Sequence, residues 1–270
     1  MSDNAKLMAG RRGLVLGVAN DHSIAWGIAR TLAAHGAEIA FTYQDDNLER
    51  RVRPLAESVG SDLVLQADVE DAASLDAVFA ALDQRWGRLD FLVHSLAWSD
   101  RAQLQGAYVD TTAENFARSL HISCFSLTDL CRRALPLMEA GGGGSVITLT
   151  YAGSMRVAPN YNVMGVAKAA LEASVRYLAA DLGPRGIRVN ALSPGPLRTL
   201  AGSAVRDSRE LFKVYQRNAP LRRNPTLDEV GGAALYFLSD LSGAVTGEVH
   251  HIDGGYHIIG VPRTEGDVSG

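Results

Sequence analysis

The sequence lacks an excess of charge of one sign and lacks any long apolar run. Lys and Arg together number 26 against 30 Asp and Glu, so the net charge is −4 at neutral pH. This even balance predicts no nucleic-acid partner and no anionic membrane surface. No stretch approaches the roughly 18 apolar residues of a membrane-spanning helix, and the N-terminus carries no signal-peptide core. We therefore expect a soluble cytoplasmic protein without membrane insertion.

Cysteine is scarce, and the motifs of several enzyme classes are missing. Cys124 and Cys131 lie seven residues apart in one predicted helix, too far for a disulfide bond, which indicates reduced core thiols of a cytosolic protein. His250 and His251 point to opposite faces of a predicted strand, so no metal site is predicted. The nucleophile elbow G-x-S-x-G is also absent. These absences argue against metal-dependent and serine-hydrolase chemistry.

The chain does contain a regular alternation of apolar strands and amphipathic helices. The expected strands are 13–19, 38–43, 62–68, 89–96, 145–150, 187–192 and 248–253. The expected helices are 23–35, 47–59, 72–86, 113–140, one from about 160, and 226–238. Short, nearly continuous apolar strands are typical of a parallel sheet buried on both faces. We predict a single doubly wound Rossmann-type α/β domain over 1–270, whose seven-stranded parallel sheet has the order 3-2-1-4-5-6-7 and is flanked by helices.

The strand–helix alternation weakens after Pro194. Residues 195–223 have helical composition but stand where a further strand is due. We interpret about 197–222 as a substrate-binding loop or helical lid, with an ordinary pair of surface helices as the alternative. Residues 226–229 (TLDE) match a capping box that opens the next helix. The polar tail from about 262 is expected to be mobile.

The turn after the first strand is a candidate phosphate site. Backbone N–H groups at a helix start, together with the helix dipole, favour a phosphate there. The fingerprint G-x-G-x-x-G is absent, because the turn reads GVANDHSIA from Gly17. A tight packing turn is therefore the alternative to a dinucleotide site.

The ends of the next strands indicate which dinucleotide is bound. Gln44 ends the second strand, at the position that faces the adenosine ribose in such folds, and two aspartates follow it. A ribose 2′-phosphate would meet these carboxylates, which predicts NADH in preference to NADPH unless Arg50 or Arg51 turns back toward it. Asp68 and the residue after it suit the adenine, and the residues after the fourth strand suit the floor beneath the ribose.

Two tyrosines and one lysine converge on a strand end and a helix. Tyr161 and Lys168 are seven residues apart in a helical pattern, which places them on one face about two turns apart. Tyr151 ends the preceding strand. Together they suit binding of a nicotinamide ribose and polarisation of a substrate oxygen. A lysine that reaches solvent beside a packing tyrosine is the alternative.

With these features assembled, the chain resembles the short-chain dehydrogenase/reductases. More narrowly, it is similar to their divergent branch of NADH-dependent enoyl-(acyl-carrier-protein) reductases of bacterial type II fatty-acid synthesis. The resemblance runs from about residue 12 to residue 258. Its most specific pieces are SIAWGIA (23–29), AFTYQ (40–44), PNYNVMGVAKAALEASVRYLA (159–179) and RVNALSPGPLRTLA (188–201).

The resemblance implies roles for individual residues. Tyr161 would donate to the substrate carbonyl, Lys168 would bind the cofactor ribose, and Tyr151 would be a second active-site tyrosine. The implied dinucleotide site consists of Gly17, Ser23, Ile24, Gln44, Asp68, Val69, Ser95, Lys168, Leu197 and Thr199. Ala97 would contact substrate beside the tyrosines, and Trp98, larger than the usual aromatic there, would narrow the pocket. The implied substrate is an enoyl-acyl carrier protein or enoyl-CoA, the cofactor is NADH, and the assembly is a homotetramer.

The seven-residue spacing suits conjugate reduction. A carbonyl reductase of this superfamily has tyrosine four residues before the lysine, where this chain has Met164. In 1,4-reduction of an enoyl thioester the hydride lands on Cβ, and the oxygen that gathers charge lies two carbons away. A donor displaced by one turn, roughly 5 Å, suits this transition state. The expected reaction is reduction of the 2,3 double bond of trans-2-enoyl thioesters; a carbonyl or imine reductase using Tyr151 as acid, and a non-catalytic dinucleotide-binding protein, remain alternatives.

Overall fold

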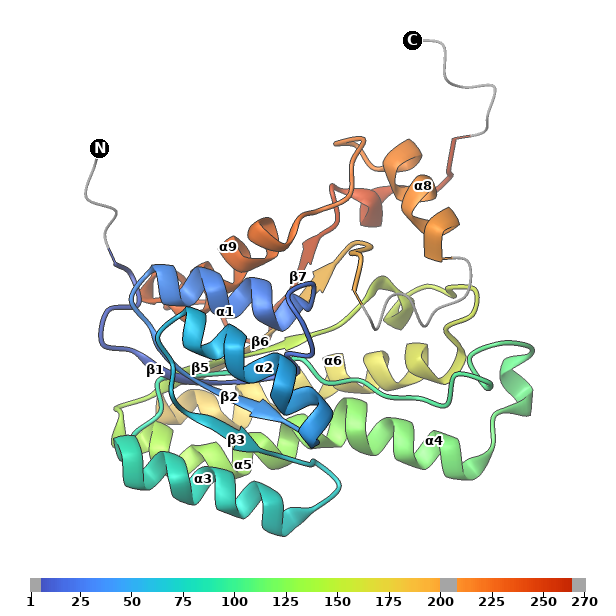
Figure 1. Cartoon of the computed structure of the whole chain (residues 1–270). Helices are drawn as coiled ribbons and strands as arrows, with labels where there is room; N and C mark the ends of the chain where they lie inside the picture. Colours follow the sequence, from blue (N-terminus) through green and yellow to red (C-terminus); the bar gives the residue numbers. More distant parts are fainter. Residues whose placement is uncertain (1–5, 200–207, 264–270) are drawn as a thin grey trace.

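The computed structural model describes residues 6–199 and 208–263 and contains a seven-stranded sheet between two layers of helices (Figure 1). The strands are β1 (Arg12–Leu16), β2 (Glu38–Tyr43), β3 (Val64–Gln66), β4 (Phe91–His94), β5 (Gly144–Leu149), β6 (Ile187–Pro194) and β7 (Val249–Ile252). All neighbours pair in parallel, in the order β3-β2-β1-β4-β5-β6-β7. This confirms the predicted topology. The order reverses between β1 and β4, where ligands of such sheets bind beyond the carboxyl ends of the strands.

Helices pack on both faces of the sheet. One face carries α1 (Ile24–Ala34), α2 (Asp46–Ser58) and α9 (Leu227–Leu238), and the other carries α3 (Ala72–Trp86), α5 (Ser126–Ala140) and α6 (Asn162–Leu182). The remaining helices are α4 (Ala113–Leu120) and α8 (Ser208–Asn218). Single 3₁₀ turns occupy Tyr108–Asp110, Ala152–Ser154, Gly183–Arg185, Asp240–Ser242 and Tyr256–Ile258.

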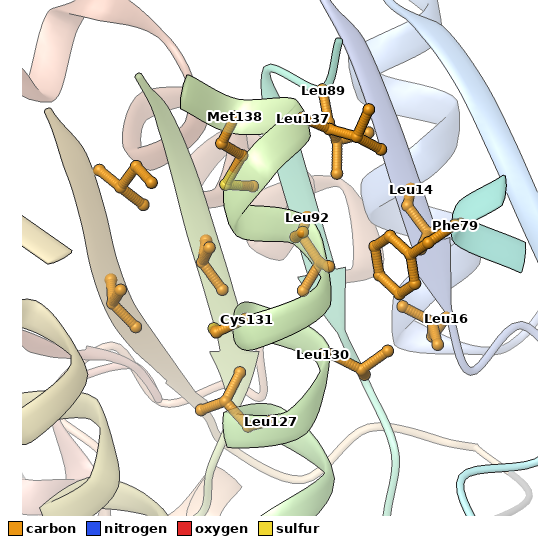
Figure 2. Packing of buried hydrophobic residues seen from close by; sticks show 14 of the residues in the cluster. Leu14, Leu16, Phe79, Leu89, Leu92, Leu127, Leu130, Cys131, Leu137 and Met138 are labelled. Atoms are coloured by element: carbon orange, nitrogen blue, oxygen red, sulfur yellow. The ribbon is translucent and has the colours of Figure 1, made fainter. Parts of the chain in front are cut away.

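Leucine is the most frequent residue in the hydrophobic core on the α3, α5 and α6 side (Figure 2). Leu14 of β1, Leu92 of β4 and Leu130 of α5 have no exposed surface. Full burial of one such side chain contributes about 1.5–3 kcal/mol. Cys124 and Cys131 belong to the same cluster as free thiols, which confirms the predicted absence of a disulfide between them. Burial raises the pKa of Cys131 to about 12.

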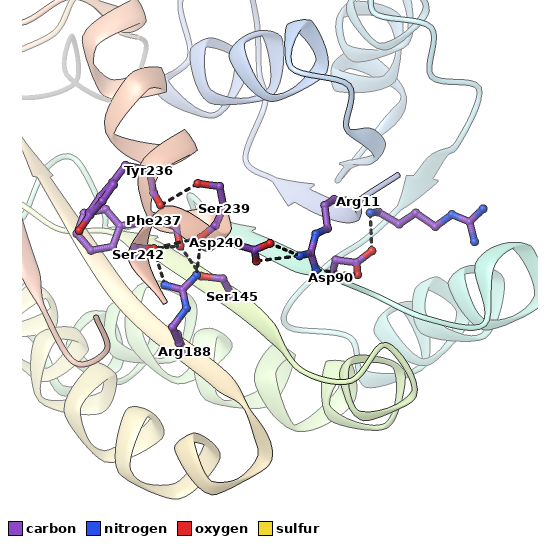
Figure 3. Close-up of polar contacts among 10 residues, drawn as sticks. Arg11, Asp90, Ser145, Arg188, Tyr236, Phe237, Ser239, Asp240 and Ser242 are labelled. Carbon is purple, nitrogen blue, oxygen red and sulfur yellow. Dashed lines mark hydrogen bonds and ion pairs between the residues drawn. The ribbon is translucent and has the colours of Figure 1, made fainter. Parts of the chain in front are cut away.

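Polar contacts fasten the amino edge of the sheet to the end of α9 (Figure 3). The Arg188 guanidinium donates to Ser242 Oγ at 2.7 Å and to the Ser239 carbonyl at 3.1 Å. Arg11 donates to both carboxylate oxygens of Asp240 at 2.8 Å. These contacts satisfy polar groups at the C-terminal end of α9.

The predicted helix over 113–140 is wrong in one respect, because a π-helical turn (His121–Phe125) interrupts it between α4 and α5. The Ser126 hydroxyl donates to the Ile122 carbonyl at 2.6 Å and also contacts His94 Nε2 at 2.8 Å. A side chain that hydrogen-bonds the carbonyl of the preceding turn perturbs the regular ladder there. The interruption therefore accompanies a contact with β4, which helical periodicity does not encode.

Several element boundaries differ from the predicted ones. β1 ends at Leu16 rather than at residue 19 because Gly17 adopts a left-handed φ of +97°. β3 and β4 are shorter than predicted, and β6 extends to Pro194. α6 begins at Asn162, so Tyr161 is the residue that precedes the helix rather than one within it.

The C-terminal third contains two further predicted features. The capping box is confirmed: Thr226 Oγ1 accepts from the Glu229 N–H at 3.2 Å, and Glu229 Oε2 accepts from the Thr226 N–H at 2.9 Å. Of the predicted lid at 197–222, residues 200–207 lie outside the described part of the chain, and α8 forms most of the remainder. The predicted tail lies outside it from residue 264 onward.

Candidate active site

A cavity of about 1700 Å³ opens at the carboxyl edge of the sheet. Residues that directly follow four strands line it: Gly17 after β1, Ser95 after β4, Thr150 after β5 and Gly195 after β6. Sites for one drug-sized ligand occupy roughly 300–1,000 Å³. The cavity therefore has room for a dinucleotide and a second molecule beside it.

Lys168 and the two tyrosines meet in this cavity. Lys168 is 5% exposed, and its Nζ donates to the Leu149 carbonyl at 2.7 Å. Because the Lys168 side chain keeps its ammonium group buried, the alternative of a lysine that reaches solvent is wrong. The rings of Tyr151 and Tyr161 pack edge to face with centroids 5.2 Å apart. The structure thus brings together the three side chains that the sequence singled out.

Burial sets the protonation of this group. It lowers the pKa of Lys168 to about 8 and raises the pKa of Tyr161, with the neighbouring Tyr151 and Glu172 adding to the rise. The pKa of Tyr151 is raised as well, mainly by burial. Both phenols are therefore protonated at neutral pH and can act as hydrogen-bond donors.

The turn after β1 is shaped for an anion. A Cβ atom on Gly17 would lie 2.1 Å from the Ser95 carbonyl oxygen, so only glycine fits this close approach. Ser23 stands at the N-cap position of α1, but its hydroxyl accepts from the N–H groups of Ala19 and Asn20, each at 3.0 Å. No side chain caps the first turn of α1. A helix start without a side-chain cap, beside a glycine turn, fits the pyrophosphate of a dinucleotide.

The residues predicted for the adenosine gather at the ends of β2 and β3. Gln44 Nε2 donates to Asp68 Oδ2 at 3.2 Å. The Val69 carbonyl accepts from His121 Nε2 at 3.2 Å. Asp45 caps α2, because its Oδ1 accepts from the backbone N–H groups of Asn47 and Leu48, at 2.9 Å each.

Not every predicted site residue lines the cavity. Those that do are Gly17, Ile24, Ser95, Ala97, Tyr151, Tyr161, Lys168, Leu197 and Thr199. Those absent from its wall are Ser23, Gln44, Asp68 and Val69. Ser23 instead organises the turn beneath the wall, and the other three form the separate cluster at the ends of β2 and β3.

Trp98 is held in the cavity wall by several contacts that the sequence did not predict. Its backbone N–H donates to Ser123 Oγ at 2.9 Å. The Arg118 guanidinium lies 4.1 Å from the centre of its ring, and Arg118 in turn donates to both carboxylate oxygens of Glu70 at 2.8 Å. Stacking of Arg on Trp together with a bidentate ion pair restricts both side chains. The size of Trp98 was visible in the sequence, but its partners were not.

Helix α8 closes one side of the cavity. Leu211, Phe212 and Val214 line it. On the inner side of α8, Tyr215 is 2% exposed and stacks on Tyr256 with ring centroids 3.8 Å apart. The helical composition of 195–223 pointed to this element, but no periodicity identified Tyr215.

His94 is a buried core histidine whose two ring nitrogens both have hydrogen-bond partners. It has no exposed surface, and its ring nitrogens contact Thr148 Oγ1 at 2.7 Å and Ser126 Oγ at 2.8 Å. Burial, with a smaller effect of Lys168, lowers its pKa to about 3. Within 6–199 and 208–263, no cluster of three or more His, Cys, Asp or Glu side chains is arranged for a metal ion. No helix in these ranges is both long and apolar enough to span a membrane.

The reversed strand order, the glycine turn and the buried tyrosine–lysine group define a Rossmann-type protein with the site layout of the short-chain dehydrogenase/reductases. The model of the family described as enoyl-(acyl carrier protein) reductase matches residues 17–257. The chain therefore belongs to the enoyl-(acyl carrier protein) reductase family.

Individual relatives agree over nearly the whole length. Enoyl-(acyl-carrier-protein) reductase (NADH) 2 of Rhizobium meliloti (strain 1021) is 61% identical over 259 residues, which cover 96% of each chain. Enoyl-(acyl-carrier-protein) reductase (NADH) FabI of Rickettsia felis is 53% identical over 254 residues, which cover 94% of this chain and 97% of the relative. The crystal structure of the reductase from Anaplasma phagocytophilum in complex with NAD has a TM-score of 0.92 at 54% identity, covering 96% of this chain and 98% of that one.

Proposed function

We propose that this protein reduces the 2,3 double bond of trans-2-enoyl thioesters carried by acyl carrier protein, with NADH as reductant, in fatty-acid elongation. The observation that carries the proposal is the convergence of Tyr151, Tyr161 and Lys168 in one cavity with the Gly17 turn. The names of the relatives, which specify NADH and enoyl-acyl carrier protein, support the choice of cofactor and substrate.

The residues of this chain have separable tasks in that reaction. When bound, NADH would supply the hydride for Cβ, and protonation at Cα completes the reduction of the double bond. Tyr161 is the donor to the thioester oxygen, since burial keeps its phenol protonated until enolate charge develops on that oxygen. Tyr151 packs against the Tyr161 ring and limits its movement. Lys168, anchored on the Leu149 carbonyl, binds the ribose hydroxyls.

Preference for NADH is supported by the residues at the end of β2. Gln44 and Asp68 are joined by a hydrogen bond, which leaves an amide and a carboxylate where the adenosine ribose is expected. A 2′-phosphate would be repelled by Asp68 and by Asp45, whose carboxylate is engaged as a helix cap. Arg50 and Arg51 are both exposed on α2. The two free hydroxyls of NADH suit this site better than the phosphate of NADPH.

We propose that 197–222 is a lid over the substrate. Phe212 of α8 lines the cavity, which supports a substrate-covering role for that segment.

We also propose that the protein is a cytoplasmic homotetramer. Large apolar side chains are exposed elsewhere, among them Phe125 at 51%, Tyr177 at 76% and Leu241 at 61%. Contacts with other subunits would remove such surface from water.

NADH oxidation with crotonyl thioesters on acyl carrier protein and on coenzyme A tests the proposal, with NADPH and a ketone as comparisons. We expect turnover of the enoyl thioesters and a higher kcat/KM with NADH than with NADPH. Turnover of the ketone alone would favour a carbonyl reductase. Cofactor binding without any turnover would favour a non-catalytic dinucleotide-binding protein.

A further inference from the structure

Glu172 is a buried carboxylate that the proposed reaction does not use. It is 7% exposed and lies on α6 four residues after Lys168, which places both side chains on one face of the helix. Its Oε1 accepts from the Thr150 hydroxyl at 2.6 Å. Burial of a carboxylate is costly unless it meets hydrogen-bond donors or an opposite charge. A role for this group has to explain that cost.

Glu172 and Lys168 are connected both through the end of β5 and through a shared face of α6. Thr150, which holds the carboxylate, lies directly between Leu149, whose carbonyl accepts from Lys168 Nζ, and Tyr151. The same three-residue stretch at the end of β5 therefore positions the ammonium, the carboxylate and one active-site phenol. The ammonium and the carboxylate also share the face of α6 that packs on this stretch. Glu172 is thus held in place relative to Lys168.

Few other charges face the Lys168 ammonium. From β4, His94 is held neutral because burial lowers its pKa to about 3. From the π turn, Cys124 presents a thiol, which contacts Ser174 Oγ at 3.4 Å. Cys124 opposes the lowering of the Lys168 pKa by more than Glu172 does, but a thiol can act as a countercharge only in its thiolate form. From α6, Glu172 presents a carboxylate.

The carboxylate of Glu172 also acts on groups of other elements. It contributes to the raised pKa of Tyr161, which precedes α6, after burial and Tyr151. It opposes the lowering of the pKa of His251 on β7, a lowering caused mainly by burial and by His257. The negative charge of Glu172 is therefore felt on both sides of the site.

We propose that Glu172 is a positioning residue for Lys168: its carboxylate, held by the Thr150 hydroxyl, supplies the countercharge that keeps the buried ammonium protonated while it binds the cofactor ribose. The ribose-binding role of Lys168 rests on the proposed function. The charge state of Lys168 does not, and it can be measured without turnover.

The direction of the effect follows from the electrostatics. Burial already lowers the pKa of Lys168 to about 8 with Glu172 in place. An opposite charge near a buried ammonium favours the protonated form, so removal of the carboxylate lowers that pKa further. A smaller fraction of Lys168 is then charged in weakly alkaline solution. The alkaline limb of the activity profile consequently moves to lower pH in Glu172→Gln.

The lysine content makes a direct measurement practical. The chain has only Lys6, Lys168 and Lys213. In protein labelled with ¹³C at the lysine ε-carbons, we expect the Lys168 resonance to titrate near pH 8 and to move down by about one pH unit in Glu172→Gln. The Lys213 resonance is the control within the same molecule, and Lys168→Arg identifies the signal. An unchanged Lys168 midpoint in folded Glu172→Gln would overturn the proposal.

Three further variants distinguish the effect of the Glu172 carboxylate on the pKa of Lys168 from other causes of a shift in that pKa. Cys124→Ala tests the thiol as the source of charge; a shift there with none in Glu172→Gln would refute the role of Glu172. Glu172→Asp keeps the charge at a greater distance, so we expect a midpoint between those of the parent and of Glu172→Gln. If Glu172→Gln does not fold, Glu172→Asp decides, and a parental midpoint in it counts against the proposal. Glu139→Gln, an exposed site on α5, is the matched control.

Activity provides the second readout. In kcat/KM for crotonyl thioester and NADH, the alkaline limb of Glu172→Gln should move with the Lys168 midpoint, while NADH affinity well below that midpoint stays near the parental value. A purely structural role would lower the rate equally at all pH values, and that result would overturn the proposal. If the parent protein reduces no enoyl thioester, the proposed function fails, and the lysine titration still decides the role of Glu172.

Discussion

Gly231 and Gly232 are adjacent in α9 but meet very different surroundings, so alanine at Gly231 should leave the protein less stable than alanine at Gly232. At Gly231, a Cβ atom would lie 2.2 Å from Thr31 Oγ1 and 3.0 Å from the Gly27 carbonyl oxygen of α1. Thr31 Oγ1 is itself held by donating to that carbonyl at 2.9 Å. At Gly232, no atom lies within 4 Å of the added Cβ. The crossing of α1 and α9 thus depends on one glycine of the pair.

The magnitudes follow from two opposing effects. Alanine in a helix interior is favoured over glycine by about 1 kcal/mol. Overpacking of a tight contact costs about 1–3 kcal/mol. Gly232→Ala should therefore raise the free energy of unfolding by about 1 kcal/mol. Gly231→Ala should lie about 1–3 kcal/mol below it.

Thermal and urea unfolding measure the difference. For chains of this size, 1 kcal/mol corresponds to about 2–4 °C in Tm, so the two variants should be clearly separated. Because α1 begins at the Gly17 turn, which we propose binds the dinucleotide pyrophosphate, a displaced α1 in Gly231→Ala should also weaken NADH binding, while Gly232→Ala should not affect it. Equal stability of the two variants would show that the helices separate without cost and would refute the argument from close approach.

Three further predictions concern the site and the fold. Tyr161→Phe should lower kcat on crotonyl thioester by about 10²-fold, the usual cost of losing one oxyanion donor, and a parental rate would show that another group is the donor. Trp98→Phe should raise kcat/KM for long-chain enoyl thioesters relative to crotonyl thioester on the order of tenfold, because it widens an apolar wall; an unchanged chain-length profile would contradict this. Thr226→Ala should lower the free energy of unfolding by about 1 kcal/mol in urea titration by removing the α9 cap, whereas no change would mean that the cap is dispensable.

Local patterns in the sequence were sufficient for the sheet and its order. Most strands were visible as short apolar runs, with 248–253 (EVHHID) as the exception, and right-handed crossovers leave few topologies for such a series. The capping box was equally visible, because Thr226 and Glu229 are close in sequence and contact each other directly. Boundaries were less accurate where a distant residue decides them. The π turn, for example, accompanies the contact of Ser126 with His94, 32 residues away.

The site was predictable in its residue types but not in its electrostatics. The spacing of Tyr161 and Lys168 identified the pair, yet Tyr161 proved to precede α6 rather than to lie within it. Glu172 was overlooked, although a charged residue on the apolar face of a helix, four residues after Lys168, was a signal available in the sequence. Trp98 was noted for its size, while its stacking with Arg118 depends on the packing of α4.

By itself, the sequence determined the alternation of strands and helices, the capping box of α9 and the family, because these depend on residues within a few positions of one another. Tertiary structure alone decided which groups lose water together. Only in the folded chain does the end of β5 meet α6, so that burial lowers the pKa of Lys168 to about 8 against the opposing effect of Glu172. Charge states depend on burial and on neighbours from distant segments, and no local pattern records them.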